Sequence, residues 1–212
     1  MSNDIRAVLR RAPVMPVITI QGAARAAPLA RALAAGGLTA IEITLRTAAA
    51  LEAIAAVARE VPECLAGAGT VLNGRDLAAA REVGAAFAVS PGATPELLAA
   101  ARADGSPFLP GIATAGELMA GLAAGFECFK LFPAAQAGGP AMLKSLGGPF
   151  PNVRFCPTGG IDLKSAPAYL ALANVDCVGG SWVAPEPLIE AGDFAAIEAL
   201  AREAAALSRA AD

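Results

Sequence analysis

Short apolar segments alternate with longer segments in which apolar residues recur at helical spacing, along nearly the whole chain. The longer segments are rich in Ala, Leu, Glu and Arg, and pairs such as Leu29 and Leu33 fall on one helical face. The short segments are the expected strands: Val14–Ile20, Ala40–Thr44, Leu65–Gly69, Ala86–Ser90, Phe108–Gly111, Cys128–Phe132, Val153–Pro157 and Val175–Gly179. Strands and helices in this order predict an α/β fold, a closed parallel (β/α)8 barrel or TIM barrel. An open doubly wound sheet would show the same alternation.

Residues at the expected helix ends support this division of the chain. Thr47, Thr94 and Thr114 stand where N-caps are expected, and Glu117 completes a capping box with Thr114. Glycines stand at other helix ends, where a left-handed residue is favoured: Gly36-Gly37, Gly84 and Gly125. The segment before Val14 is expected to form an extra helix over the barrel floor. No interior stretch has the composition of a linker, so residues 1–212 are expected to form a single (β/α)8 domain.

The expected strand exits are rich in Gly and Pro, whereas the helix-to-strand connections are plainer. The exits carry Gly67-Ala68-Gly69-Thr70, Ser90-Pro91-Gly92, Pro110-Gly111, Phe132-Pro133, Thr158-Gly159-Gly160 and Gly179-Gly180-Ser181. Barrel enzymes build their sites at the carboxyl ends of the strands. Tight turns need Gly and Pro in any case. The charged residues placed among these glycines are therefore the stronger indication of a site.

Lys130 lies within an apolar run, where its amine would lose water unless the fold had a use for it. Strand alternation puts Lys130 and Glu42 on the less bulky faces of the sixth and second expected strands, which should line the barrel interior. Alternate strands share a layer of side chains, so the two residues are expected to meet near the axis. A functional site is favoured over the alternatives, which are a structural ion pair or an amine that reaches water.

A lysine deprived of water can be uncharged near neutral pH and can form a Schiff base with a carbonyl carbon. Burial and the nearby cation Arg46 favour the neutral amine, whereas an ionised Glu42 favours the ammonium form. The chain has no histidine, which removes the commonest general base and the commonest zinc ligand. Catalysis would therefore rely on lysine, carboxylate, arginine or hydroxyl groups.

Two features indicate the kind of ligand. Thr158-Gly159-Gly160 and Gly179-Gly180-Ser181 close the seventh and eighth expected strands, where this fold usually binds phosphate with backbone N–H groups and a hydroxyl. Arg46 and Thr70 lie at adjacent strand exits and are expected to hold a carboxylate together. A solvated rim position is the alternative for Arg46. Lys144 and Lys164 lie in polar, helix-like contexts and are expected to be solvated.

Composition narrows the function classes further. Hydrophobic residues make up 56% of the chain, enough for a large core and for apolar surface covered by another subunit. The net charge of −3 gives no indication of a nucleic-acid or membrane surface. Neither a signal peptide nor a membrane span is expected. Four dispersed cysteines, Cys64, Cys128, Cys156 and Cys177, indicate buried free thiols in a reducing cytosol, and hence a cytoplasmic protein.

Several segments together resemble the 2-keto-3-deoxy-6-phosphogluconate (KDPG) aldolases of the class I, Schiff-base type, a family that also includes 4-hydroxy-2-oxoglutarate aldolases. They are Glu42-Ile43-Thr44-Leu45-Arg46-Thr47, Gly67-Ala68-Gly69-Thr70-Val71, Ser90-Pro91-Gly92, Phe129-Lys130-Leu131-Phe132-Pro133-Ala134, Arg154-Phe155-Cys156-Pro157-Thr158-Gly159-Gly160 and Gly179-Gly180-Ser181-Trp182. The resemblance runs from about Pro13 nearly to the C-terminus. The loop Ala135-Gln136-Ala137-Gly138-Gly139 differs from an Asn-rich form in some members, with no expected consequence.

The resemblance implies reversible cleavage of the phosphorylated keto acid to pyruvate and glyceraldehyde 3-phosphate, as in Entner–Doudoroff sugar-acid catabolism. Lys130 would form the imine, and Glu42 would transfer protons. The implied substrate contacts are Arg46 and Thr70 to the carboxylate, Pro91 and Phe132 around pyruvate, Thr158 to the substrate, and Gly159, Gly160, Gly180 and Ser181 to the phosphate. A homotrimer is implied, and no metal or organic cofactor.

Other functions remain open from the sequence. Within the aldolases, the substrate could be 4-hydroxy-2-oxoglutarate, cleaved to pyruvate and glyoxylate, or the galactonate-derived epimer. A phosphosugar isomerase or epimerase would share the barrel and the phosphate site but would not need Lys130. A non-catalytic protein that binds a phosphorylated metabolite is the alternative outside enzymes.

Overall fold

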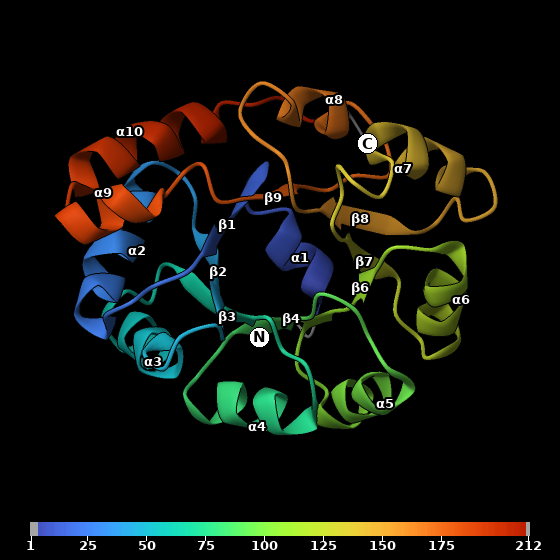
Figure 1. Cartoon of the computed structure of the whole chain (residues 1–212), viewed down its shortest axis with the longest axis horizontal. Coiled ribbons are helices and arrows are strands. Elements are labelled where there is room, and N and C mark those ends of the chain that lie inside the picture. The colour runs from blue at the N-terminus through green and yellow to red at the C-terminus, as the bar shows by residue number, and fades with distance from the viewer. Residues whose placement is uncertain (1–3, 211–212) are drawn as a thin grey trace.

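The computed structural model describes residues 4–210 of the chain, and its parallel strands form a ring surrounded by helices (Figure 1). The strands are β1 Val14–Ile18, β2 Ala40–Thr44, β3 Leu65–Gly69, β4 Phe87–Val89, β5 Phe108–Leu109, β6 Gly111–Ile112, β7 Cys128–Leu131, β8 Arg154–Pro157 and β9 Val178–Gly180. The helices are α1 Ile5–Leu9, η1 Ala23–Arg25 (a 3-10 turn), α2 Ala26–Ala35, α3 Ala50–Glu60, α4 Gly74–Glu82, α5 Pro95–Asp104, α6 Ala115–Ala123, α7 Gly139–Gly147, α8 Ala166–Leu170, α9 Glu186–Ala191 and α10 Phe194–Ala205.

The strand order shows that the sheet closes on itself. One sheet has the hydrogen-bonded order β5-β4-β3-β2-β1-β9 and the other β6-β7-β8. Parallel bridges from Phe155 to Val175 and from Thr158 to Gly179 link β8 to the β9 segment. Pro110, which has no N–H to donate, separates β5 from β6, so these two short strands are the halves of the fifth barrel strand. The predicted (β/α)8 barrel is confirmed, and the open doubly wound sheet is wrong.

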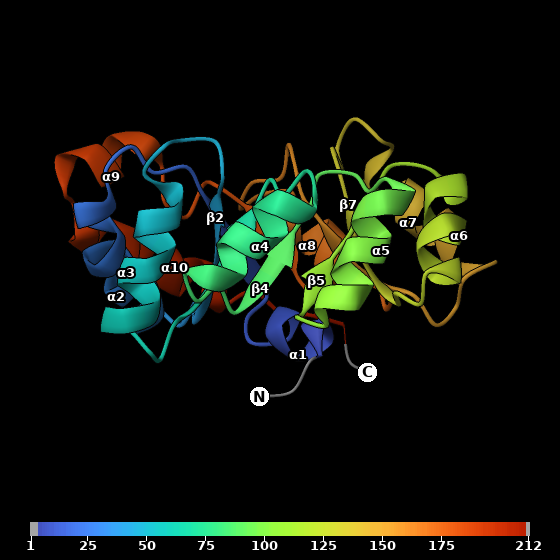
Figure 2. The same cartoon turned by 90° about the horizontal axis from the view of Figure 1, so that it is seen from below.

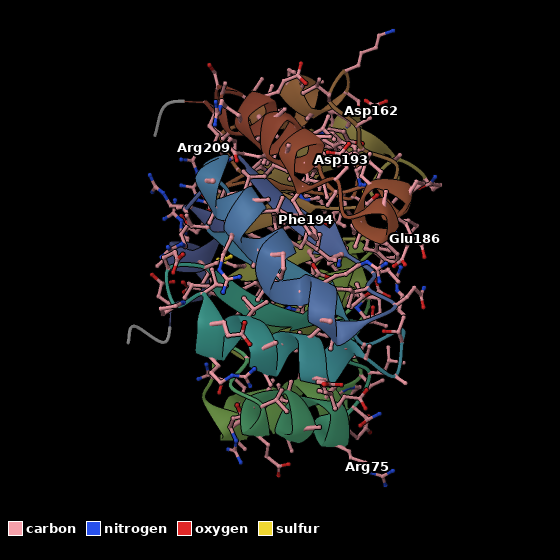
Figure 3. All side chains as sticks on the ribbon, turned by 90° about the vertical axis from the view of Figure 1, so that its left-hand side faces the viewer. Arg75, Asp162, Glu186, Asp193, Phe194 and Arg209 are labelled. Carbon is pink, nitrogen blue, oxygen red and sulfur yellow. The ribbon has the colours of Figure 1, made fainter. Side chains whose placement is uncertain are left out.

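Helices cover the outside of the ring. Strand residues that face outward, such as Ile18, Ile41 and Phe129, belong to the main hydrophobic core with the inner faces of the helices. Figure 3 shows α10, α2, α3 and α4 following one another around this surface, with Phe194 at the start of α10. Alanine and glycine let the helices approach closely: a Cβ added at Gly36 would overlap Ala201 of α10. The alanine-rich composition is therefore explained in part by helix packing.

The predicted extra helix is confirmed as α1, which lies across the barrel floor (Figure 2). Val8 and Leu9 of α1 pack in a second cluster with interior residues such as Met15, Phe87 and Cys128. Arg6 of α1 also forms an ion pair of 3.0 Å with buried Asp176, just before β9. The floor is thus sealed, and the interior opens toward the carboxyl ends of the strands.

Most of the predicted helix ends are confirmed. Thr94 caps α5, and Thr114 forms the capping box with Glu117 at the start of α6. The expectation for Thr47 is wrong, because α3 begins at Ala50 and the Thr47 hydroxyl donates instead to the Ile20 carbonyl at 2.6 Å. Thr47 therefore ties the loop after β2 to the loop after β1, at the rim of the barrel.

The four cysteines are free and buried, as expected. Burial raises the pKa of the Cys64 and Cys128 thiols to about 12. The Cys177 thiol donates to Cys156 Sγ at 3.5 Å, and this contact and burial raise its pKa as well. Among residues 4–210, no helix is both long and apolar enough to cross a bilayer.

Candidate active site

Lys130 and Glu42 meet inside the barrel, as the strand alternation predicts. Lys130 comes from β7 and Glu42 from β2, on opposite sides of the ring (Figure 1). The Lys130 Nζ donates to Glu42 Oε1 at 3.0 Å and to Oε2 at 3.3 Å. Lys130 is 4% exposed and Glu42 2%. A charge this deeply buried persists only with a partner and hydrogen bonds, so each group depends on the other until a ligand enters.

The space for the Glu42 carboxylate comes from the neighbouring strand. Glu42 pairs in register with Gly67 of β3, and Gly69 lies two residues further along. A Cβ added at Gly69 would overlap the Glu42 carboxylate. Gly69 lies in a segment that resembles the aldolase family, but the sequence does not predict it as a site residue. The role of Gly69 in leaving room for Glu42 follows from the register of β2 and β3. The sequence does not give this register.

Arg46 and Thr70 are adjacent at the rim, as predicted. The Arg46 Nε donates to Thr70 Oγ1 at 3.1 Å. Arg46 is exposed, which agrees both with a residue that binds a ligand at the rim and with the solvated position considered as the alternative. Thr70 has φ of 59°, in the left-handed region that β-branched residues avoid. Backbone strain of this kind concentrates at functional sites, where the surrounding structure fixes one geometry.

Phe132 borders the lysine, and Pro91 lies over Gly111, which pairs in register with Lys130. The Phe132 ring centroid lies 5.4 Å from Lys130 Nζ, within the range of a cation–π contact. The peptide bond from Phe132 to Pro133 is cis. The loop carrying Pro91 lies directly over Gly111 of β6, where a Cβ would overlap the Pro91 backbone. The buried Ser90 hydroxyl accepts the Gly111 N–H at 3.2 Å and so fixes this loop.

Thr158 and the glycine pairs form the opposite side of the rim. Thr158 is buried, and its hydroxyl lies against Gly179, where a Cβ would overlap it. Gly159 and Gly160 have φ of 102° and 71°, which L-residues rarely adopt. Within residues 4–210, the backbone N–H groups of Gly160 and Ser181 have no hydrogen-bond acceptor. The exits of β8 and β9 therefore present unpaired donors and the exposed Ser181 side chain.

Two interior threonines were not predicted as site residues. Thr44 shares the face of Glu42 on β2, and its hydroxyl donates to the Ile18 carbonyl at 3.0 Å. Thr19, directly after β1, lies with its hydroxyl oxygen 3.1 Å from that of Thr44. The alternation that selected Glu42 also selects Thr44, but neutral hydroxyls carry little sequence signal. Lys144 on α7 and Lys164 in a turn before α8 are exposed, as expected.

A closed parallel barrel with a buried lysine–carboxylate pair and polar groups around its carboxyl rim defines a (β/α)8-barrel enzyme. The family model for KDPG and KHG aldolases matches residues 5–200. A 2-dehydro-3-deoxy-phosphogluconate aldolase of Pseudomonas aeruginosa is 52% identical over 94% of this chain and 91% of its own length. The chain therefore belongs to the KDPG and KHG aldolase family.

Two solved structures agree with this assignment. The 2-keto-3-deoxy-6-phosphogluconate aldolase of Zymomonas mobilis ZM4 with 3-phosphoglycerate is 51% identical, with a TM-score of 0.93 over 99% of both chains. A KDPG aldolase of Legionella pneumophila, with pyruvate captured as a covalent carbinolamine intermediate, is 46% identical. Its TM-score is 0.94 over 96% of this chain and 98% of its own.

Proposed function

We propose that the protein is a class I aldolase that cleaves 2-keto-3-deoxy-6-phosphogluconate reversibly to pyruvate and glyceraldehyde 3-phosphate. The observation that carries this proposal is the buried contact of 3.0 Å between Lys130 Nζ and Glu42 Oε1. The family relationship supports it, as does the pyruvate carbinolamine in the Legionella pneumophila relative. The residues and roles below are part of the proposal.

Lys130 acts as the nucleophile once its proton passes to Glu42. The neutral amine attacks the keto carbon to give a carbinolamine, and Glu42 returns a proton to the departing hydroxyl, so water leaves and an imine forms. Glu42, again a carboxylate, then takes the proton of the C4 hydroxyl directly or through water, and later returns it to C3. The C3–C4 bond breaks, the aldehyde forms at C4, and the electron pair moves into the imine as an enamine. Protonation at C3 and hydrolysis release pyruvate and the free lysine.

The rim holds the two ends of the substrate. Arg46, oriented by Thr70, binds the carboxylate, since its remaining guanidinium N–H groups suit a carboxylate. Pro91 and Phe132 enclose the three carbons of pyruvate. This places the keto carbon beside Lys130, whose Nζ lies against the Phe132 ring.

The phosphate binds at the exits of β8 and β9. The N–H groups of Gly160 and Ser181 and the Ser181 hydroxyl supply the donors, Gly159 and Gly180 border the phosphate, and Thr158 contacts the substrate inside them. Support comes from the unpaired N–H groups there and from the relative with 3-phosphoglycerate, which carries the same phosphate ester as the aldehyde product.

Trapping with borohydride tests the proposal. Wild-type protein with pyruvate and borohydride should gain a stable adduct on Lys130, located by peptide mass spectrometry, and Lys130→Met should gain none. Circular dichroism checks that the variant is folded. An isomerase or epimerase would form no adduct. A non-catalytic binding protein would turn over nothing, and Lys130→Ala would keep its ligand affinity.

4-Hydroxy-2-oxoglutarate is the second candidate substrate, because the matching family comprises both KDPG and KHG aldolases. Its cleavage needs Lys130 and the carboxylate-binding residues Arg46 and Thr70, but it needs no phosphate site. Side-by-side kcat/KM values for the phosphogluconate, phosphogalactonate and hydroxyoxoglutarate substrates decide the preference. The unpaired donors at the β8 and β9 exits favour a phosphorylated substrate.

We also propose that the single domain assembles as a homotrimer in the cytoplasm. An apolar surface between α5 and α6 supports assembly, and its residues include Ala93, Pro95, Leu98, Ala99, Ala120 and Ala124. Met119, also on α6, is a large apolar side chain that is 60% exposed. Light scattering on the purified protein tests the trimer. The free cysteines support a reducing compartment.

A further inference from the structure

The hydroxyl of Thr19 occupies a defined place at the mouth of the barrel. Its oxygen lies 3.1 Å from Thr44 Oγ1, and Thr44 Oγ1 lies 3.0 Å from the Ile18 carbonyl oxygen. Thr44 is fully buried, whereas Thr19 is partly exposed. Thr44 therefore cannot touch a ligand directly, but Thr19 can.

Strand alternation along β1 directs Thr19 to the interior. Ile18 and Ile20 belong to the outer core under the helices, and Met15 belongs to the interior cluster. Thr19 has the parity of Met15, and its contact with Thr44 confirms the direction. Val17 is in register with Glu42, so Thr19 lies one interior position above the carboxylate, nearer the rim.

The strand order places Thr19 between the two ends of the proposed substrate. The sheet runs β3-β2-β1-β9, and Figure 1 shows β1 between β2 and β9. The proposed carboxylate-binding residues, Arg46 and Thr70, lie at the exits of β2 and β3. The proposed phosphate site lies at the exits of β8 and β9. A substrate that spans them passes β1 with its middle carbons. This step rests on the proposed function.

The positions of the two threonine hydroxyl protons determine whether Thr19 can donate or accept a hydrogen bond with a ligand. A carbonyl oxygen only accepts, so the single Thr44 proton goes to Ile18, and Thr19 donates its own proton to Thr44. Thr19 then presents lone pairs to the interior. These suit a ligand group that remains a donor throughout the reaction. The C4 oxygen loses its proton and becomes a carbonyl on cleavage, whereas the C5 hydroxyl is a donor before and after it.

We propose that Thr19 is a specificity-determining residue that accepts a hydrogen bond from the C5 hydroxyl of the substrate. That hydroxyl is the C2 hydroxyl of glyceraldehyde 3-phosphate. Thr44 is a positioning residue, because it binds the Thr19 proton and acts only through Thr19. The pair selects aldehydes that carry a hydroxyl beside the aldehyde carbon and has no effect on imine formation with pyruvate.

Aldol addition of pyruvate to two aldehydes tests the assignment. The aldehydes are glyceraldehyde 3-phosphate and its analogue without the C2 hydroxyl, 3-oxopropyl phosphate. Thr19→Val keeps the shape and removes the hydroxyl, and Thr19→Ser restores it. We expect Thr19→Val to lower kcat/KM for glyceraldehyde 3-phosphate about 3- to 10-fold, the effect of one neutral hydrogen bond. Thr19→Ser should stay within about 2-fold of wild type. Both variants should match wild type on the deoxy aldehyde.

Equal losses on both aldehydes, or no loss on either, would overturn the assignment. Thr44→Val should cause a smaller loss confined to glyceraldehyde 3-phosphate, and a loss on the deoxy aldehyde as well would remove its positioning role. Borohydride trapping of pyruvate by the same variants separates the two proposals. If wild type forms no adduct, the aldolase function fails; if every variant forms it and the aldehyde preference is unchanged, only the Thr19 assignment fails.

Discussion

The amine of Lys130 and the carboxylate of Glu42 lie 3.0 Å apart although 87 residues separate them in the chain (130 − 42 − 1). The contact joins opposite walls of a barrel whose floor is sealed by α1. Both groups are buried, and within residues 4–210 the Lys130 amine donates its side-chain hydrogen bonds to the Glu42 carboxylate alone. In the proposed mechanism, a ligand that enters from the rim therefore meets the nucleophile Lys130 already paired with its base, Glu42.

Glu42→Gln should leave imine formation possible and slow turnover. An amide of the same size still fits beside Gly69 but neither takes nor returns a proton. We expect borohydride to trap pyruvate on Lys130 in this variant while kcat falls about 10²-fold or more. Steady-state kinetics and mass spectrometry measure both quantities. Near-normal turnover would remove Glu42 from its proposed role.

Ser181→Ala should act on phosphorylated substrates alone. Loss of a hydrogen bond to a charged phosphate should raise KM for 2-keto-3-deoxy-6-phosphogluconate about 10-fold or more. Cleavage of 4-hydroxy-2-oxoglutarate, which has no phosphate, serves as the internal control and should be nearly unchanged. Losses of the same size on both substrates would show that the phosphate site is assigned wrongly.

Gly69→Ala should damage the site through space alone. The added methyl group would overlap the Glu42 carboxylate, which must then shift away from Lys130. A displacement of a catalytic group by about 1 Å can lower kcat/KM about 10²-fold. Gly116→Ala is the matched control, because its Cβ would lie 4.0 Å from the nearest atom, Thr114 Oγ1. Equal activity of the two variants would show that the Glu42 position tolerates the methyl group.

The capping box of α6 should make part of the stability depend on pH. The Ala113 N–H, with the Thr114 hydroxyl and N–H, holds the pKa of Glu117 below its usual range. A carboxyl with a lowered folded pKa stabilises above its unfolded pKa, and that contribution is lost as pH falls through the folded value. The difference in unfolding free energy between wild type and Glu117→Gln should therefore shrink on acidification from pH 7.

Urea unfolding at several pH values measures this difference. Thr114→Ala, which loses the N-cap itself, should cost about 1 kcal/mol at pH 7. A difference between wild type and Glu117→Gln that does not change with pH would contradict the role of the Glu117 charge.

The sequence by itself determined the order of strands and helices and which faces of β2 and β7 are interior. Alternation with period two selected Lys130 and Glu42, because a charge in an apolar strand is informative wherever the strand lies. The sequence was less accurate where backbone hydrogen bonds decide the bounds of an element. Pro110 divides one strand, and β9 spans Val178–Gly180 instead of the expected Val175–Gly179. Thr47 binds a carbonyl instead of capping a helix.

Only the tertiary structure decided what depends on neighbours from other strands. Gly69 and Gly179 leave room for Glu42 and Thr158, Ser90 fixes the backbone at Gly111, and Thr44 holds Thr19. Each relationship depends on register and closure, which place residues side by side that the chain keeps far apart. Local pattern therefore gives the charged residues of the site, and three-dimensional packing gives the small residues that hold them in place.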